Sequence, residues 1–216
     1  MARPPRFSTD QLLDAAVPLG AAAGPAGITM SALARATGAP SGSVYHRFPG
    51  RDALLAEVWL RTVERFQEGW FAAMDSGADA RRAGRAAARH VVAWSRAHPQ
   101  EAALLLYGAE DFGRSGWSGE HRARADRGDR RVRAALAALA AGLGADGPGT
   151  DGPADRERIA LALIDLPLSV VRRPLRAGQP LPAHAERLAE ECADALLGGA
   201  PLSGAPDAPG PAGPAG

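Results

Sequence analysis

The stretch TMSALARATGAPSGSVYHRFPGRDALL, residues 29–55, decides the fold of this chain. Its first part places Leu33 in an apolar stripe with three- and four-residue spacing, which predicts a short helix. Gly38 ends this helix, because glycine adopts a positive φ without a steric penalty. Pro40 opens a second short helix, with Ser41 as the nearest side chain able to cap it. Two short helices joined through a glycine turn predict a helix-turn-helix unit, whose second helix enters the major groove of DNA.

Composition predicts an all-α protein. The chain has 216 residues, of which 46% are hydrophobic and only 5% aromatic. Alanine-rich segments favour helices, because alanine loses no side-chain entropy there. Runs of alternating apolar and polar residues long enough for a strand are almost absent. The net charge of +1 does not by itself indicate a nucleic-acid partner.

The residue types that are missing exclude several kinds of chemistry. All 25 basic residues are arginines, so a P-loop and Schiff-base catalysis are both excluded. The five histidines and the single cysteine, Cys192, have no zinc-ligand spacing. We therefore expect no enzymatic activity, no cofactor and no metal. A lone cysteine and the lack of a membrane-spanning apolar run predict a cytoplasmic protein without membrane contact.

Helix signals continue on both sides of the opening stretch. Ser8 and Gln11 fit a capping box at the start of the first helix, in which Pro18 predicts a kink or an early end. The Gly/Pro-rich segments 144–153 and 198–216 predict a flexible connector and a disordered tail. Later helices are expected at 51–74, 81–97, 99–112, 121–143, 155–175 and 182–197.

The opening stretch resembles the DNA-binding domain of the tetracycline-repressor (TetR) family of transcriptional regulators. The positions that match the family pattern are Thr29, Leu33-Ala34, Gly38, Ala39-Pro40, Gly42, Tyr45, His46, Phe48 and Arg51. The resemblance implies a helix-turn-helix DNA-binding domain over 1–52 and a helical effector-binding and dimerisation domain over 53–197. It also implies a homodimeric repressor that binds palindromic operator DNA and is released by a small molecule. Gly20 departs from the bulky aromatic residue frequent in the family, which predicts weaker packing of the first helix.

The family's DNA contacts transfer residue by residue. Gly42 would allow close approach to the groove, and Arg3 and Arg6 would form an arm in the minor groove. The recognition helix has neither asparagine nor glutamine, so specificity is expected to rely on small polar contacts and DNA shape. The predicted backbone contacts are Thr29, Tyr45, His46 and Arg51, and the predicted base contacts are Ser41, Ser43 and Arg47.

The resemblance places an effector pocket among the middle helices. Such sites have mostly apolar walls with a few polar anchors, so a largely apolar effector is expected. The candidate anchors are His90, Arg96, Asp111 and Asp165. The predicted walls are Phe66, Trp70, Val91, Trp94, Leu105, Tyr107, Phe112 and Trp117.

The last two helices have apolar faces that can pair with their twofold mates in a four-helix bundle. The alternative is that these faces form the core of a single protomer. Pro167 interrupts the first of the two helices. The predicted interface residues are Ile159, Leu163, Leu166, Val170, Leu188, Cys192 and Leu196.

A second function is compatible with the same residues. The chain would then be a DNA-binding dimer without a small-molecule ligand, whose C-terminal half serves only dimerisation or protein recruitment. An occupiable cavity among the middle helices distinguishes the two functions.

Overall fold

The computed structural model describes residues 8–76, 79–144 and 153–198, and within these ranges it contains helices and no strands. The expected connector and tail fall mostly outside the described residues, as do Arg3 and Arg6. The N-terminal elements are α1 (Thr9–Ala23), η1 (Pro25–Gly27), α2 (Met30–Thr37) and α3 (Ser41–Arg47). The later elements are α4 (Arg51–Asp75), α5 (Ala80–Ala97), α6 (Pro99–Leu104), η2 (Arg114–Gly116), α7 (Gly119–Gly144), α8 (Pro153–Ala160), η3 (Leu161–Asp165), α9 (Leu166–Arg176) and α10 (Ala185–Leu197).

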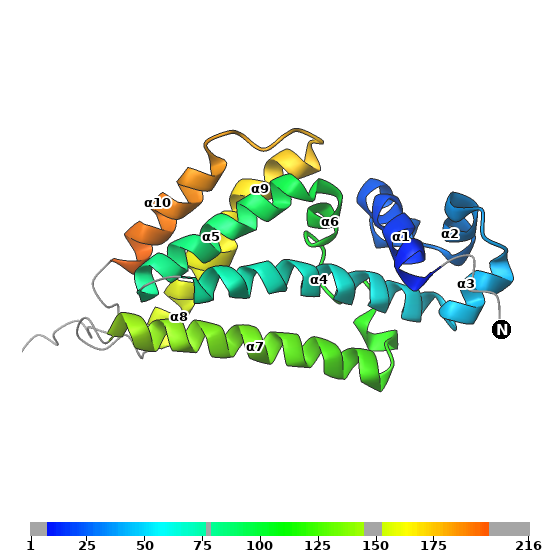
Figure 1. Cartoon of the computed structure of the whole chain (residues 1–216), viewed down its shortest axis with the longest axis horizontal. Helices are drawn as coiled ribbons and strands as arrows, with labels where there is room; N and C mark the ends of the chain where they lie inside the picture. Colours follow the sequence, from blue (N-terminus) through cyan, green and yellow to red (C-terminus); the bar gives the residue numbers. More distant parts are fainter. Residues whose placement is uncertain (1–7, 77–78, 145–152, 199–216) are drawn as a thin grey trace, which may run out of the picture.

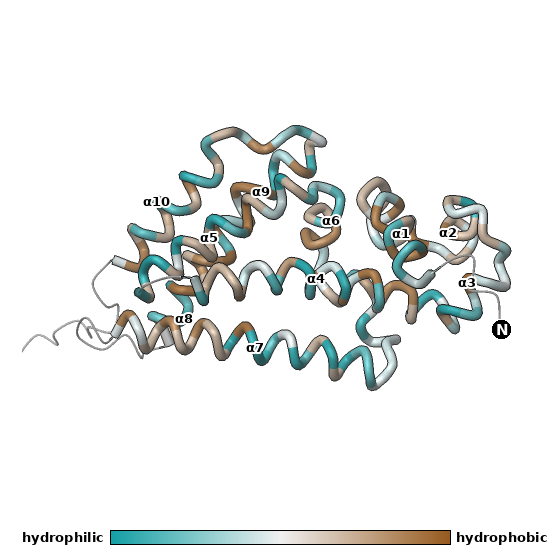
Figure 2. Tube along the Cα trace, viewed as in Figure 1, coloured by the Kyte–Doolittle hydropathy of each residue, from teal (hydrophilic) through white to brown (hydrophobic). Residues whose placement is uncertain are grey.

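The long helix α4 connects the two ends of the molecule. Helices α1–α3 gather around its first half, and α5 packs along its second half, with α9 and α10 packed against α5 (Figure 1). Helix α7 runs beside α4 over most of its length. The first half of α7 is largely hydrophilic and the second half largely apolar (Figure 2), and only the second half buries large side chains such as Leu139.

The first helix begins as predicted and ends later than predicted. Ser8 Oγ accepts a hydrogen bond from the Gln11 backbone N–H at 3.1 Å, and Gln11 Oε1 accepts one from the Ser8 N–H at 2.9 Å. This capping box is therefore confirmed. The helix continues through Pro18 to Ala23, so the predicted early end does not occur. Residues on both sides of the proline are buried, and their packing offsets the missing backbone hydrogen bond.

Gly20 is a site of close packing, and the expectation that it weakens the first helix is wrong. The residue is buried, and a Cβ at this position would lie 2.5 Å from Leu104 Cδ2 and 2.8 Å from Ile28 Cδ1. Both of these side chains are fully buried. Glycine therefore allows α6 to pack directly against α1.

Gly20→Ala is expected to lower the free energy of unfolding by about 1–3 kcal/mol, because the added methyl group overpacks the core. Gly42→Ala is the matched control, because a Cβ at Gly42 has no neighbour within 4 Å. The control should leave stability unchanged or raise it by about 0.5–1 kcal/mol. Urea unfolding at one fixed protein concentration measures both. A Gly20→Ala variant as stable as the wild type would contradict the close packing.

Two later helices differ from the sequence prediction. Helix α6 ends at Leu104, not near residue 112. The predicted helix 155–175 exists as α8, the π-helical segment η3 and α9. At the end of η3 the N–H of Leu166 donates to the carbonyl of Leu161. Pro167 follows directly in the first turn of α9, where the shift to π hydrogen bonding makes its missing N–H tolerable. Across the described ranges, no helix is long and apolar enough to cross a membrane.

Candidate nucleic-acid interface and effector cavity

Helix α3 presents one polar face to solvent. Val44 is the residue that this helix buries, and Phe48 directly after it is 1% exposed, so these two hold the helix on the core. The exposed residues Ser41, Gly42, Tyr45 and His46 follow the i, i+1, i+4, i+5 spacing of a single helix face. Tyr45 is 56% exposed, an unusual position for a large aromatic side chain. The two predicted backbone contacts on α3 therefore share a face with two residues predicted to approach the groove.

The turn before α3 is held by local hydrogen bonds. Thr29 Oγ1 caps α2 by accepting from the Ala32 N–H at 3.1 Å. Gly38 has φ 65°, the left-handed conformation expected after the first short helix. Pro40, not Ser41, stands at the N-cap of α3, and the Ser43 N–H donates to the Pro40 carbonyl at 2.8 Å. The expectation of a Ser41 cap is wrong, because the fixed φ of proline already starts the helix one residue earlier.

Arg51 has a role within the protein that the sequence did not reveal. Its Nε donates to the Ile28 carbonyl at 3.1 Å, and its Nη2 donates to the Pro25 carbonyl at 2.9 Å. Arg51 is the first residue of α4, so these bonds tie that helix to the loop before α2. A phosphate contact by Arg51 stays a prediction. Among the predicted base contacts, Ser43 and Arg47 are half-buried and Ser41 is exposed.

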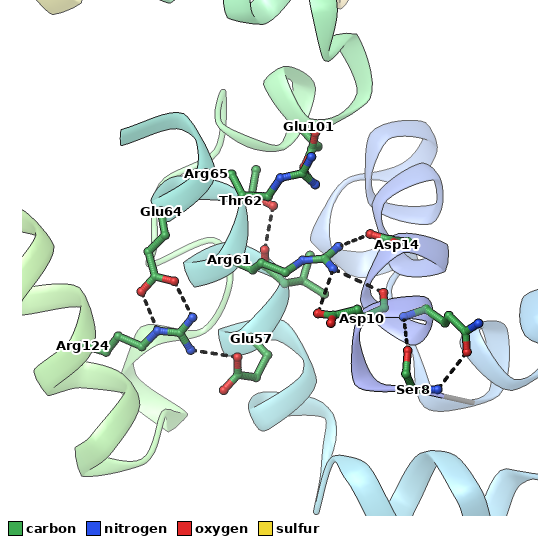
Figure 3. Close-up of polar contacts among 12 residues, drawn as sticks. Ser8, Asp10, Asp14, Glu57, Arg61, Thr62, Glu64, Arg65, Glu101 and Arg124 are labelled. Carbon is green, nitrogen blue, oxygen red and sulfur yellow. Dashed lines mark hydrogen bonds and ion pairs between the residues drawn. The ribbon is translucent and has the colours of Figure 1, made fainter. Parts of the chain in front are cut away.

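Charged side chains on α4 connect it to α1, α6 and α7 (Figure 3). Arg61 reaches α1, where its Nη2 lies 2.7 Å from Asp14 Oδ1. Arg65 donates to the buried carboxylate of Glu101 on α6 at 2.7 Å. On the other side, Arg124 of α7 donates to Glu57 at 2.9 Å and to both carboxylate oxygens of Glu64. Hydrogen bonding to Glu64, with Glu57 beside it, raises the pKa of Arg124 above its already high value.

A cavity of about 250 Å³ lies among the middle helices. Of the predicted wall residues, Phe66, Trp70, Val91, Trp94, Leu105 and Tyr107 line it. The residues of the wall that the prediction missed are Trp59, Val63, Gln67, Ser95, Ala102, Asp129, Val132, Ile164, Leu168 and Val171. Trp59, Val63, Phe66 and Trp70 recur every three or four residues on α4, so helical spacing was the signal that could have found the first two.

Phe112 and Trp117 do not line the cavity, and their assignment to the pocket is corrected. They are 0% and 2% exposed and belong to the core that also contains α1–α3. Trp117 Nε1 donates to the Phe112 carbonyl at 2.9 Å. For Phe112 the prediction failed because α6 ends at Leu104, so this residue lies in the segment between α6 and α7 that packs with the first half of α4. Trp117 lies outside the predicted helices in the sequence as well, and its ring packs on Trp59 of α4.

The four proposed anchors also lie outside the cavity wall. His90 Nε2 lies 3.2 Å from the Phe66 carbonyl, and burial lowers the pKa of this imidazole below its ordinary value. Arg96 donates to Glu186 and to two backbone carbonyls. Asp111 accepts the Gly108 N–H, and Asp165 is exposed. Structural pairing therefore accounts for most of these side chains.

The structure places two of the predicted dimer-interface residues inside the protomer. Ile159 and Leu163 are 1% and 0% exposed inside the protomer core, so they cannot face a second copy. These two residues therefore follow the alternative of a protomer core, where they pack in one cluster with Val91 of α5 and Leu139 of α7. The π-helical turn then puts Pro167 and Val171, and not Leu166 and Val170, in the buried positions that follow. Leu161, which the prediction missed, is 40% exposed and Leu188 is 39% exposed. Four other predicted interface residues are half-buried, namely Leu166, Val170, Cys192 and Leu196.

Comparison with known proteins gives a sequence match for the N-terminal part of the chain and structural matches for most of its length. Residues 12–58 match the family model described as bacterial regulatory proteins, tetR family. No curated protein sequence matches the chain. Two solved structures similar in fold are the regulator FadR from Bacillus subtilis in complex with stearoyl-CoA and the ketosteroid regulator KstR2 of Mycobacterium tuberculosis. The first has a TM-score of 0.69 and 16% identity over 89% of this chain and 100% of that one. The second has a TM-score of 0.67 and 18% identity over 91% and 96%.

Proposed function

We propose that this protein, whose N-terminal residues match the DNA-binding domain of the tetR family of bacterial regulatory proteins, is a ligand-responsive transcriptional repressor. It binds palindromic operator DNA as a homodimer and releases it when a small molecule occupies the cavity. The observation that carries the proposal is the exposed face of α3, with Tyr45 and His46 free of the core. A protein that binds the chromosome of a bacterium acts in the cytoplasm.

Operator binding is tested with duplexes from the DNA that flanks the protein's own gene. Fluorescence anisotropy should detect a site with two half-sites about one helical turn or more apart. Affinity should fall as salt increases, because arginine contacts release counterions from the phosphates. A duplex in which one half-site is scrambled is the control. Equal binding to both duplexes would contradict a palindrome-reading dimer.

The cavity favours this function over a dimer that binds DNA without a ligand. Its walls are mainly apolar and aromatic, and its volume of about 250 Å³ is unfilled by protein side chains. A helical half that served dimerisation alone has no need of such a space, whose apolar and aromatic walls are typical of small-molecule sites. Of the two similar structures, FadR is in complex with stearoyl-CoA and KstR2 is a ketosteroid transcriptional regulator. Both are consistent with a ligand-controlled protein of this fold.

Two contacts connect the cavity to the DNA-binding end. Helix α4 supplies Trp59 and Val63 to the cavity wall and begins at Arg51, which is bound to the loop before α2. Tyr107 also lines the cavity, and its ring lies against Gly24 at the end of α1. A Cβ at Gly24 would lie 2.9 Å from the Tyr107 hydroxyl oxygen. A ligand that shifts Tyr107 or tilts α4 would thus change the separation of the two α3 helices and the affinity for the operator.

A double-mutant cycle tests the Tyr107 contact. Gly24→Ala should weaken operator binding, because alanine is strained at φ 65° and its methyl group collides with Tyr107. Tyr107→Ala removes the collision but not the backbone strain. The two changes should therefore couple by about 0.5–3 kcal/mol in operator binding. Additive effects in anisotropy titrations would show that the contact between Tyr107 and Gly24 does not influence operator binding by α3.

A further inference from the structure

The wall of the cavity combines aromatic rings with a single charge. Five of the chain's eleven aromatic residues line it, namely Trp59, Phe66, Trp70, Trp94 and Tyr107. The indole Nε1 atoms of Trp59 and Trp70 are buried and have no hydrogen-bond partner among the described residues. Aromatic carbon surfaces attract cations through the negative potential of the ring face.

Asp129 is the charged residue of this wall. The other polar residues that line the cavity, Gln67, Ser95 and the Tyr107 phenol, are neutral side chains. Ser95 already donates its hydroxyl to the Val91 carbonyl at 2.7 Å. Because no cationic side chain among the described residues lines the cavity, the Asp129 carboxylate favours a positively charged group on a ligand there.

The Asp129 side chain is 46% exposed and has a long ion pair with one arginine, Arg114. Arg114 Nη1 lies 3.8 Å from Asp129 Oδ2, and its other terminal nitrogen is hydrogen-bonded to Asp126. Three further arginines, Arg124, Arg127 and Arg131, line a neighbouring groove between α4 and α7 but not the cavity. Arg124 is paired with Glu57 and Glu64, and the Arg131 guanidinium stacks 3.8 Å from the centre of the Phe71 ring.

We propose that the cavity takes a lipophilic organic cation, an apolar or aromatic body that carries a quaternary or protonated amine beside Asp129. The body would pack among the five aromatic side chains, and the charge would lie at the Asp129 end, where the cavity adjoins the groove along α7. This inference rests on the proposed function only in using the same cavity, and it names the class of effector. It predicts rejection of carboxylates and other anions.

Three probes that share a benzyl group and differ in its tetrahedral substituent test the charge preference. They are benzyltrimethylammonium, the uncharged isostere neopentylbenzene, and phenylmethanesulfonate. Titration of the full-length protein, followed by tryptophan fluorescence, reports binding because three of the four tryptophans line the cavity. The cation should bind about tenfold more tightly than the isostere, and the anion should bind most weakly.

Asp129→Asn should remove the preference for the cation and leave the affinity for the isostere unchanged. Asp126→Asn is the matched control, because Asp126 lies one turn away on α7, also contacts Arg114 and is outside the cavity wall. Equal binding of the cation and the isostere, tightest binding of the anion, or no binding of the cation at millimolar concentration would overturn the inference. So would an unchanged preference in Asp129→Asn. These titrations contain no DNA, so a failure of the proposed function appears separately, as absent operator binding.

Discussion

Tyr45→Ala is expected to lower operator affinity about 10- to 100-fold, with the fold intact. The side chain is 56% exposed on the face of α3 that also carries Ser41, Gly42 and His46. Its loss removes a hydroxyl that can bond to a phosphate and a ring that packs on the DNA backbone, worth about 1–3 kcal/mol together. Its removal should change the free energy of unfolding by no more than about 0.5 kcal/mol, because it supports no core.

Tyr45→Phe separates the two contributions of this side chain. If the hydroxyl binds a phosphate, Tyr45→Phe loses much of the affinity but keeps the salt dependence of the wild type, because an uncharged hydroxyl releases no counterion. If only the ring matters, the phenylalanine variant binds like the wild type. Anisotropy titrations at several salt concentrations measure both quantities, with circular dichroism as the check on folding. Unchanged operator affinity in Tyr45→Ala would show that α3 is not the helix that contacts the operator.

Leu188→Glu is expected to dissociate the homodimer and lower operator affinity by about 10²–10⁴-fold, because each half-site then binds without its linked partner. Leu188 is 39% exposed on α10, where an isolated protomer gains nothing from an exposed leucine. A carboxylate there would be buried without a partner in a dimer interface. Sedimentation velocity measures the oligomeric state, and anisotropy measures the operator affinity.

Arg187→Glu is the control for Leu188→Glu. It introduces the same side chain one residue earlier on α10, at a position where the side chain is 77% exposed. This variant should remain a dimer and bind the operator like the wild type. A Leu188→Glu protein that stays dimeric at micromolar concentration would show that the interface lies elsewhere on the molecule.

The four large apolar side chains that the described residues expose coincide with the proposed contacts. Tyr45 lies on α3, Tyr107 lies between the cavity and Gly24, and Leu161 and Leu188 lie in the last helices. Each of the four therefore has a proposed role in binding DNA, transmitting ligand occupancy or pairing protomers.

Local signals predicted the parts of the fold that depend on neighbouring residues. The Ser8 capping box and the Gly38 turn are properties of a few consecutive residues, and both were predicted correctly. The start and end of α4 followed from a Pro-Gly break and a Ser-Gly pair, and the predicted range 51–74 compares with Arg51–Asp75. Such elements are specified by backbone geometry and capping, which a single sequence displays directly.

Contacts between distant parts of the chain could not be predicted in this way. Gly20 appeared to be a weak point because its partner Leu104 is 84 residues away in sequence. Phe112 was placed in the pocket because the predicted helix 99–112 runs past the end of α6 at Leu104, and Trp117 because a sequence does not show which core a loop residue joins. Ile159 and Leu163 were placed in the dimer interface because an apolar helix face looks the same in sequence whether it packs inside one protomer or between two.

Selection of binding sites from a pool of random duplexes tests the central claim most directly, because it assumes neither an operator nor a ligand. The wild-type protein should enrich a palindromic motif with half-sites about one helical turn or more apart. The Tyr45→Ala variant, selected in parallel, should enrich no motif or a much weaker one. Failure of the wild type to enrich any palindrome, or equal enrichment by the variant, would contradict the assignment of α3 as the DNA-reading helix of a dimeric repressor.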